Sequence, residues 1–176
     1  MSGQKEMTWR QIQKATKPPV EQIIPECLGG EKAKLALEFA AYMRDNDMEL
    51  RFGGVTDTWT YKFKGKAICK VRLRANYYGY DWLLCLCVYH MDKYESEIQS
   101  KGLRDFVFDN LSHHHRCGGT CGHERRTTVF GKEAVVCWKE LGIMVGDPDE
   151  AMVDDIKWIL ELEKKGRDES AASAKK

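Results

Sequence analysis

Three stretches of strand-like sequence constrain the fold of this 176-residue chain more than any other feature. Residues 58–63 (TWTYKF) and 67–74 alternate between apolar and polar side chains, as half-buried strands do. Residues 82–89 (WLLCLCVY) are apolar throughout, which is typical of a strand that is covered on both faces. The links between these stretches, 64–66 and 76–81, are short. The pattern therefore predicts an antiparallel meander.

Helical patterns flank the predicted strands. Residues 8–15 open with Thr8 and Gln11 at the spacing of a capping box, and residues 31–46 carry apolar side chains four residues apart. A last helix is expected to begin after Asp147, a good N-cap. This order of elements predicts an α+β fold, in which helices pack on one face of an antiparallel sheet.

The chain is expected to form one α+β domain over residues 7–165. Apolar residues make up 43% of it, which is enough for a hydrophobic core. Residues 113–126 (HHHRCGGTCGHERR) have no hydrophobic period and predict a Cys/His-rich loop insertion. Residues 166–176 (GRDESAASAKK) are polar, and we expect them to form a disordered tail.

The charge balance narrows the classes of partner. The chain has 28 Lys and Arg against 27 Asp and Glu, a net charge of +1, so we expect no nucleic-acid partner. No apolar run approaches the length of a membrane span, and the first residues lack the apolar core of a secretory signal. We therefore expect a cytoplasmic protein that does not bind membranes.

The loop and the strand after it predict a metal site. Cys117 and Cys121 are separated by three residues, two of them glycine, and Cys137 follows after fifteen intervening residues. Zinc prefers four thiolate or imidazole ligands, so His123 or one of the three histidines that open the loop is the fourth candidate. Zinc is thus the expected cofactor, with Cys117, Cys121, His123 and Cys137 as its ligands.

The same residues allow two other interpretations. Nearby histidines and arginines lower a thiol pKa, so Cys117 and Cys121 are also candidates for a reactive pair or a transient disulfide. Alternatively, Cys137 is an apolar core residue of its strand and the loop thiols have no special role. The spacing alone leaves these alternatives open.

Aromatic and basic residues are concentrated in the predicted sheet. Such side chains can stack a flat ligand and hold an anion, although aromatic residues also favour strands for their packing alone. The predicted small-molecule site consists of Trp59, Tyr61, Lys62, Arg72, Tyr78, Tyr80 and Trp82.

The sequence carries no Walker A, GxGxxG, GxSxG or HExxH motif, and its acidic residues form no visible pair. An enzyme is therefore not favoured. We expect a small-molecule-binding or sensing module. The alternatives are a thiol-based redox protein or enzyme that uses the loop cysteines, and a zinc-stapled domain that binds another protein.

Several segments resemble one family of small bacterial proteins known only as a domain of unknown function. They are MTWRQIQKATKPPVEQI, TWTYKFKGKAICKV and the closing DPDEAMVDDIKWILELEK. A subset of that family has a C-G-x-C-G loop and a T-x-x-G-K-x-x-x-x-V-C strand. This chain reads CGGTCG, with one extra residue between the cysteines, and TVFGKEAVVC, with one residue fewer between the lysine and the final valine. The resemblance implies a compact α+β domain without an established activity. Its matching positions are Trp59, Lys62, Gly65, Lys66, Cys117, Cys121, Gly131, Lys132 and Cys137.

Overall fold

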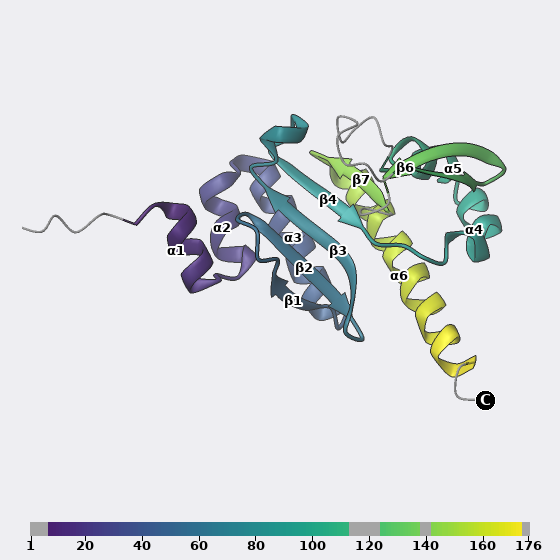
Figure 1. The fold of residues 1–176 in the computed structure, drawn as a ribbon, viewed down its shortest axis with the longest axis horizontal. Coiled ribbons are helices and arrows are strands. Elements are labelled where there is room, and N and C mark those ends of the chain that lie inside the picture. The colour runs from purple at the N-terminus through teal and green to yellow at the C-terminus, as the bar shows by residue number, and fades with distance from the viewer. Residues whose placement is uncertain (1–6, 113–123, 138–141, 174–176) are drawn as a thin grey trace, which may run out of the picture.

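The computed structural model describes residues 7–112, 124–137 and 142–173, apart from the side chains of Glu124 and Cys137. It confirms the α+β class, with an antiparallel sheet and helices against it (Figure 1). The helices are α1 (Trp9–Thr16), α2 (Val20–Cys27), α3 (Gly30–Asp45), α4 (Glu95–Ser100), α5 (Arg104–Asp109) and α6 (Glu150–Ser173), with short 3-10 turns η1 (Asn76–Tyr78) and η2 (Met91–Tyr94). The strands are β1 (Glu49–Phe52), β2 (Thr58–Phe63), β3 (Lys66–Leu73), β4 (Trp82–Leu86), β5 (Glu124–Val129), β6 (Lys132–Cys137) and β7 (Ile143–Gly146).

The main sheet has the strand order β1-β2-β3-β4-β7, and every neighbouring pair is antiparallel. The predicted meander is therefore confirmed as β2-β3-β4. The sequence did not predict β1, which pairs with the outer edge of β2. β7 returns from the far end of the chain and pairs with β4, which places β4 inside the sheet and explains its apolar sequence.

The core lies between one face of this sheet and the helices α2, α3 and α6. In Figure 1, α2 and α3 lie behind the strands, while α6 starts behind β7 and runs down beside the sheet. Trp59 faces this core from β2, where its Cα lies opposite Val71 of β3. From α3, Phe39 and Met43 are fully buried, whereas Leu35, the first residue of the predicted stripe, is only half-buried. The alternation of the strand residues and the period of the helix residues thus both point to this face of the sheet as the one that packs in the core.

The other face of the sheet carries a smaller apolar cluster near β4 and β7, formed by Leu83, Cys85, Met144 and Ala75. The ring of Tyr80 lies on Gly146, where an added Cβ would stand 2.3 Å from the ring carbon Cγ. A glycine is therefore needed at this position of β7.

The hairpin β5-β6 forms a second, two-stranded sheet. Gly131 occupies its turn with a φ of 74°, a conformation that glycine adopts at little cost. The sequence predicts strands over residues 127–130 and 134–138. Both strands form, and each begins earlier than predicted, at Glu124 and at Lys132.

The last helix is longer than predicted. α6 continues to Ser173, so the predicted disordered tail is wrong for residues 166–173. Arg167 is the physical reason, because it is only 8% exposed and donates three hydrogen bonds to main-chain carbonyls at the start of β3 and the end of β4. The polar residues 166–173 are ordered because the long side chain of Arg167 is buried against the sheet.

Candidate ligand-binding site

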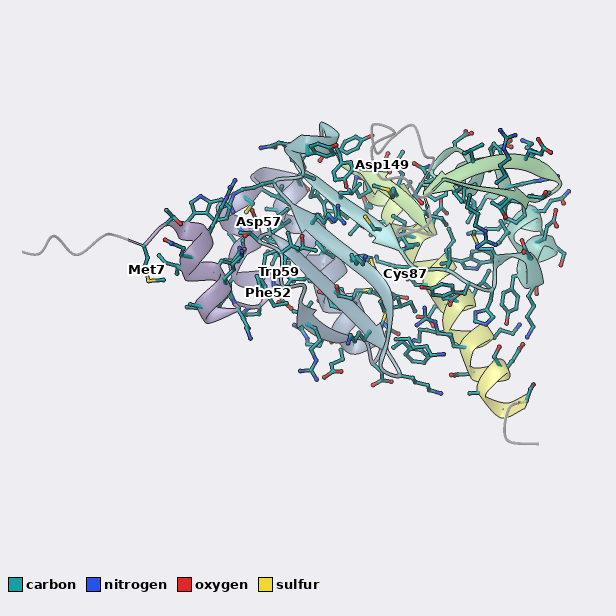
Figure 2. The ribbon with its side chains drawn as sticks, in the orientation of Figure 1. Met7, Phe52, Asp57, Trp59, Cys87 and Asp149 are labelled. Atoms are coloured by element: carbon teal, nitrogen blue, oxygen red, sulfur yellow. The ribbon has the colours of Figure 1, made fainter. Side chains whose placement is uncertain are left out.

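A crevice of about 400 Å³ opens between α1 and the end of the sheet where β2 begins and β3 ends. Figure 2 shows Asp57 in this region, between α1 and the strands. Three basic side chains and one indole ring line the crevice. Its lining residues are Trp9, Arg10, Gln11, Lys14, Val55, Thr56, Asp57, Leu73 and Arg74.

Local sequence signals set the position of α1. The backbone N–H of Thr8 donates to Oε1 of Gln11 at 2.8 Å, so the predicted helix start is confirmed. Lys17 ends the helix in the left-handed region, and Pro18 follows it. Of the α1 side chains, only Gln13 is buried. α1 therefore depends on one polar contact rather than on an apolar stripe.

Gln13 makes that contact with Asp57. Its Nε2 donates to Oδ1 of Asp57 at 2.9 Å, and its Oε1 accepts from the backbone N–H of Asp57 at 2.7 Å. The backbone carbonyl of Asp57 in turn accepts the N–H of Leu73 at 2.9 Å. Asp57 thus connects α1 to the end of β3, with a φ of 59° that is uncommon for a residue with a side chain.

Arg74 completes the crevice. Its Nη1 donates to Oδ1 of Asp57 at 2.8 Å, and its Cζ lies 4.5 Å from the centroid of the Trp9 ring. Arg10 approaches the same ring at 5.3 Å. Trp9 remains 45% exposed, so its ring is accessible from solvent while a guanidinium group holds it in place.

The charges of the crevice are unequal. Arg10, Lys14 and Arg74 contribute three cations, while the one lining carboxylate, Asp57, is buried and bonded to Gln13 and Arg74. An aromatic wall beside several cations can stack a flat ring and pair with an anionic group on it. The crevice is therefore suited to a planar anion.

Cys27 of α2 lies in the electrostatic field of Asp57 and Arg74, but it is not a nucleophile. Burial is the largest effect and raises the pKa of its thiol to about 11, which the positive charge of Arg74 offsets only in part. At neutral pH the thiol is protonated, so thiolate chemistry is not available beside the crevice.

The structure divides the seven residues of the predicted aromatic site. Trp59, Tyr61 and Trp82 are fully buried in the core beneath the helices, and the indole N–H of Trp59 donates to the carbonyl of Pro18 at 2.8 Å. Trp59 and Trp82 therefore have no surface with which to line an open cleft, and Tyr61, which is 1% exposed, only borders a separate depression beside Pro19 and Leu50. All three are packing residues, which was the alternative interpretation of the aromatic density.

The other four predicted residues are only half-buried, and they belong to a different face. Arg72 donates to the hydroxyl of Tyr78 at 2.8 Å, and Tyr80 covers Gly146. Lys62 follows Tyr61 on β2, so the alternation of the strand turns it away from the core. The seven side chains therefore do not meet at one place.

The predicted metal ligands Cys117, Cys121 and His123 lie outside the described residues. The backbone of Cys137 ends β6, with its Cα opposite that of Glu124. Within the described ranges, no group of three or more His, Cys, Asp and Glu side chains could hold a metal ion.

The residues of the crevice were not predicted from the sequence. Two signals point to them, namely an exposed tryptophan in the first helix and the absence of any acid between Met7 and Pro19, where three basic residues occur. Their meeting with Arg74 depends on the Gln13–Asp57 contact, which joins residues 44 positions apart and leaves no local pattern.

Comparisons with known proteins found no matching family model, no matching curated protein and no matching solved structure. Within residues 7–112, 124–137 and 142–173, no helix combines the length and apolar character that crossing a bilayer requires.

Proposed function

We propose that this protein is a binding module for a planar, anionic small molecule, which it holds in the crevice between α1 and the sheet. The observation that carries this proposal is the position of Arg74, which bridges the carboxylate of Asp57 and the face of Trp9. The class of function is the one expected from the sequence, and the site is a different one.

The site is organised before a ligand arrives. Asp57 and Arg74 both have φ values in the left-handed region, 59° and 49°, and the hydrogen bonds from Gln13 and Leu73 hold that backbone in place. Such backbone conformations cost free energy and cluster at functional sites. A crevice whose cations are already positioned loses less entropy on binding than a flexible one.

Isothermal titration calorimetry with matched pairs of probes tests the proposal. Aromatic carboxylates and nucleoside monophosphates are each compared with a neutral analogue of the same ring. We expect the anionic member of a pair to bind more tightly, and its affinity to fall as salt rises. Trp9→Ala should weaken binding about tenfold through the lost stacking and cation–π contact.

Arg51→Gln is the matched control, because Arg51 is an exposed arginine of β1 that lies outside the crevice lining. It should leave affinity unchanged, whereas Arg74→Gln should reduce it. If no planar anion binds, or if Trp9→Ala and Arg74→Gln bind as tightly as wild type, the proposal fails.

A second candidate function is the zinc-stapled interaction domain. The hairpin places the Cα of Cys137 opposite Glu124, which directly follows His123 in the chain. The strand therefore returns Cys137 to the end of the loop that contains Cys117 and Cys121. Thiolates with an imidazole favour zinc over magnesium or calcium.

Native mass spectrometry separates this candidate from the thiol alternatives. A bound zinc adds its mass, and both chelator and Cys121→Ser should then lower the melting temperature, while Cys27→Ser leaves the zinc bound. A mass two hydrogens lighter than the reduced chain supports a disulfide and the redox function. A mass equal to that of the bare chain, with all seven thiols titrating and no change in melting temperature on addition of chelator, rules out a bound metal.

A further inference from the structure

His90 lies across the C-terminal half of α6, and it is not one of the residues that line the crevice. Its Nδ1 is 3.2 Å from Oε1 of Glu163, and its Nε2 is 3.1 Å from Oγ of Ser170. Gly166 lies between these two helix residues, so the imidazole rests on a backbone that has no side chain in the way. Serine, histidine and a carboxylate thus follow one another at hydrogen-bond distances.

Glu163 fixes which nitrogen of His90 carries the proton. The carboxylate is 2% exposed and accepts from Nε of Arg167 at 2.7 Å and from the backbone N–H groups of Tyr89 and His90 at 2.9 and 3.1 Å. All its other partners are donors, so Nδ1 of His90 is assigned as a donor too. In the neutral ring, Nε2 then presents its lone pair to Ser170.

Ser170 is exposed, and two acceptors lie within hydrogen-bond distance of its hydroxyl, which has one proton to donate. These are the carbonyl of Gly166 at 2.8 Å, as is common for a helical serine, and Nε2 of His90 at 3.1 Å. Rotation about the Cβ–Oγ bond moves the proton from the first acceptor to the second. A histidine in this position can take the proton when the oxygen attacks an electrophile.

We propose that Ser170, His90 and Glu163 form an acyl-transfer site that hydrolyses small carboxylic esters. Ser170 is the nucleophile, His90 the general base and acid, and Glu163 the positioning residue. The arrangement follows the roles of the serine–histidine–acid triad, which recurs on unrelated folds. The proposal is independent of the crevice at α1.

The reaction balances with water as the only co-reactant. Oγ of Ser170 bonds to the ester carbonyl carbon while its proton moves to Nε2 of His90, and the carbonyl π pair moves onto oxygen. The C–O bond to the alcohol then breaks, and the alcohol takes the proton from His90. Water attacks the acyl-serine through the same steps, which release the acid and return the proton to Ser170.

One neighbour of His90 suits this chemistry. Tyr89, next to His90 in sequence, is an exposed ring that packs under Arg167 at 5.7 Å. An ester with an aromatic leaving group is therefore the probe of choice.

The test is hydrolysis of p-nitrophenyl acetate by the full-length chain, together with labelling by a fluorophosphonate and peptide mapping. We expect Ser170→Ala to lower the rate above buffer about 100-fold or more and to abolish labelling of its peptide. Ser173→Ala is the matched control. The hydroxyl of Ser173 also donates to a carbonyl of the helix, that of Glu169, whereas the contact with His90 is made by Ser170. The Ser173→Ala variant should react like wild type.

The assay also distinguishes other nucleophiles. If wild type and Ser170→Ala hydrolyse the ester equally, or if the label maps to a cysteine or to another serine, the proposal is overturned. For Glu163, the readout is the imidazole ¹⁵N spectrum of His90. We expect the proton on Nδ1 in wild type, and a shift of tautomer towards Nε2 in Glu163→Gln. A wild-type spectrum with the proton on Nε2 would contradict the assigned geometry.

Discussion

Gly166 of α6 lies directly against His90, such that a Cβ atom added to the glycine would stand 2.8 Å from both Cβ and Cγ of the histidine. Glycine inside a helix is ordinarily less stable than alanine by about 1 kcal/mol. Here the contact explains its presence, because the atoms that an added methyl group would meet belong to the base of the side chain and to the rigid ring.

Gly166→Ala should therefore destabilise the protein, against the intrinsic preference of the helix. We expect a loss of about 1–3 kcal/mol in the free energy of unfolding, as for other overpacked sites. Urea denaturation followed by circular dichroism measures it. Ala171→Gly, at an exposed position of the same helix, reports the propensity term alone and should cost about 1 kcal/mol or less. A stabilised Gly166→Ala would show that His90 does not pack there.

Gln13→Ala should release α1 without unfolding the sheet. Gln13 is the only buried side chain of α1, and its loss leaves Asp57 without two hydrogen bonds, at a cost of about 1–3 kcal/mol. We expect trypsin to cleave after Arg10 and Lys14 about tenfold faster or more, because 1.4 kcal/mol corresponds to a factor of ten in the open population. The urea midpoint of the sheet should change little.

The matched control for this variant is Gln22→Ala, an exposed glutamine of α2. It should leave the cleavage rate after Lys14 unchanged. Equal cleavage rates in Gln13→Ala and wild type would mean that the Gln13–Asp57 pair does not hold α1.

The sequence predicted those elements whose burial is periodic. The alternation over residues 58–63 assigned Trp59 and Tyr61 to one face, and the structure confirms that face as the core. β1 was missed because four residues of half-exposed strand give too short a pattern. The sequence of residues 20–28, which includes Pro25, predicts an extended segment or a single turn. Residues 20–27 instead form α2, because packing of Val20 and Ile24 outweighs the helix-breaking tendency of Pro25.

The sites were harder to predict than the fold. Aromatic density suggested a cleft at Trp59 and Trp82, but both rings are buried in the core, on the face of the sheet against which the helices pack. Ser170 and His90 are separated by 80 positions, so nothing in the local sequence indicates their contact. Asp147 was expected to cap α6, but its carboxylate accepts the N–H groups at the start of β4, and Asp149 caps the helix through Met152. Long-range polar contacts of this kind leave no periodic pattern in the sequence from which they could be predicted.

Phe39→Ala should cost about 3–5 kcal/mol, because Phe39 is 1% exposed and faces the sheet from α3. Chemical denaturation measures the change. Glu38→Ala, the exposed neighbour on the same helix, should stay within about 0.5 kcal/mol of wild type. An unchanged midpoint for Phe39→Ala would show that α3 does not pack on the sheet.

The thiol of Cys27 should react slowly in the folded protein. Burial raises its pKa from an ordinary 9.0 to about 11, so near pH 8 its thiolate fraction is lower than in the unfolded chain by roughly 100-fold. The folded state holds this proton more tightly. The stability that the thiol contributes is therefore fully present below about pH 9, the ordinary pKa, and is lost as the pH rises towards 11.

Iodoacetamide labelling followed by peptide mass spectrometry checks this prediction. The labelling rate of Cys27 should keep rising up to about pH 11 in the native chain, and it should level off near pH 9 in urea. The same rate and the same plateau in both states would contradict the burial of the thiol.

Arg167→Met should be the most damaging of the polar substitutions. The change keeps most of the apolar stem but removes the partner of Glu163, which is 2% exposed, and leaves three main-chain carbonyls without their donor. Removing one member of a buried ion pair costs about 3–5 kcal/mol, mainly because the other charge stays buried and uncompensated.

If the uncompensated charge of Glu163 is the cause, Glu163→Gln should recover about 1 kcal/mol or more in the Arg167→Met background, since the amide oxygen still accepts the N–H groups of Tyr89 and His90. Arg51→Met breaks an exposed ion pair with Glu49 and should cost less than about 1 kcal/mol. Urea denaturation of wild type and the three variants measures these differences, and an Arg167→Met that loses no more stability than Arg51→Met would show that α6 is not anchored through its buried arginine.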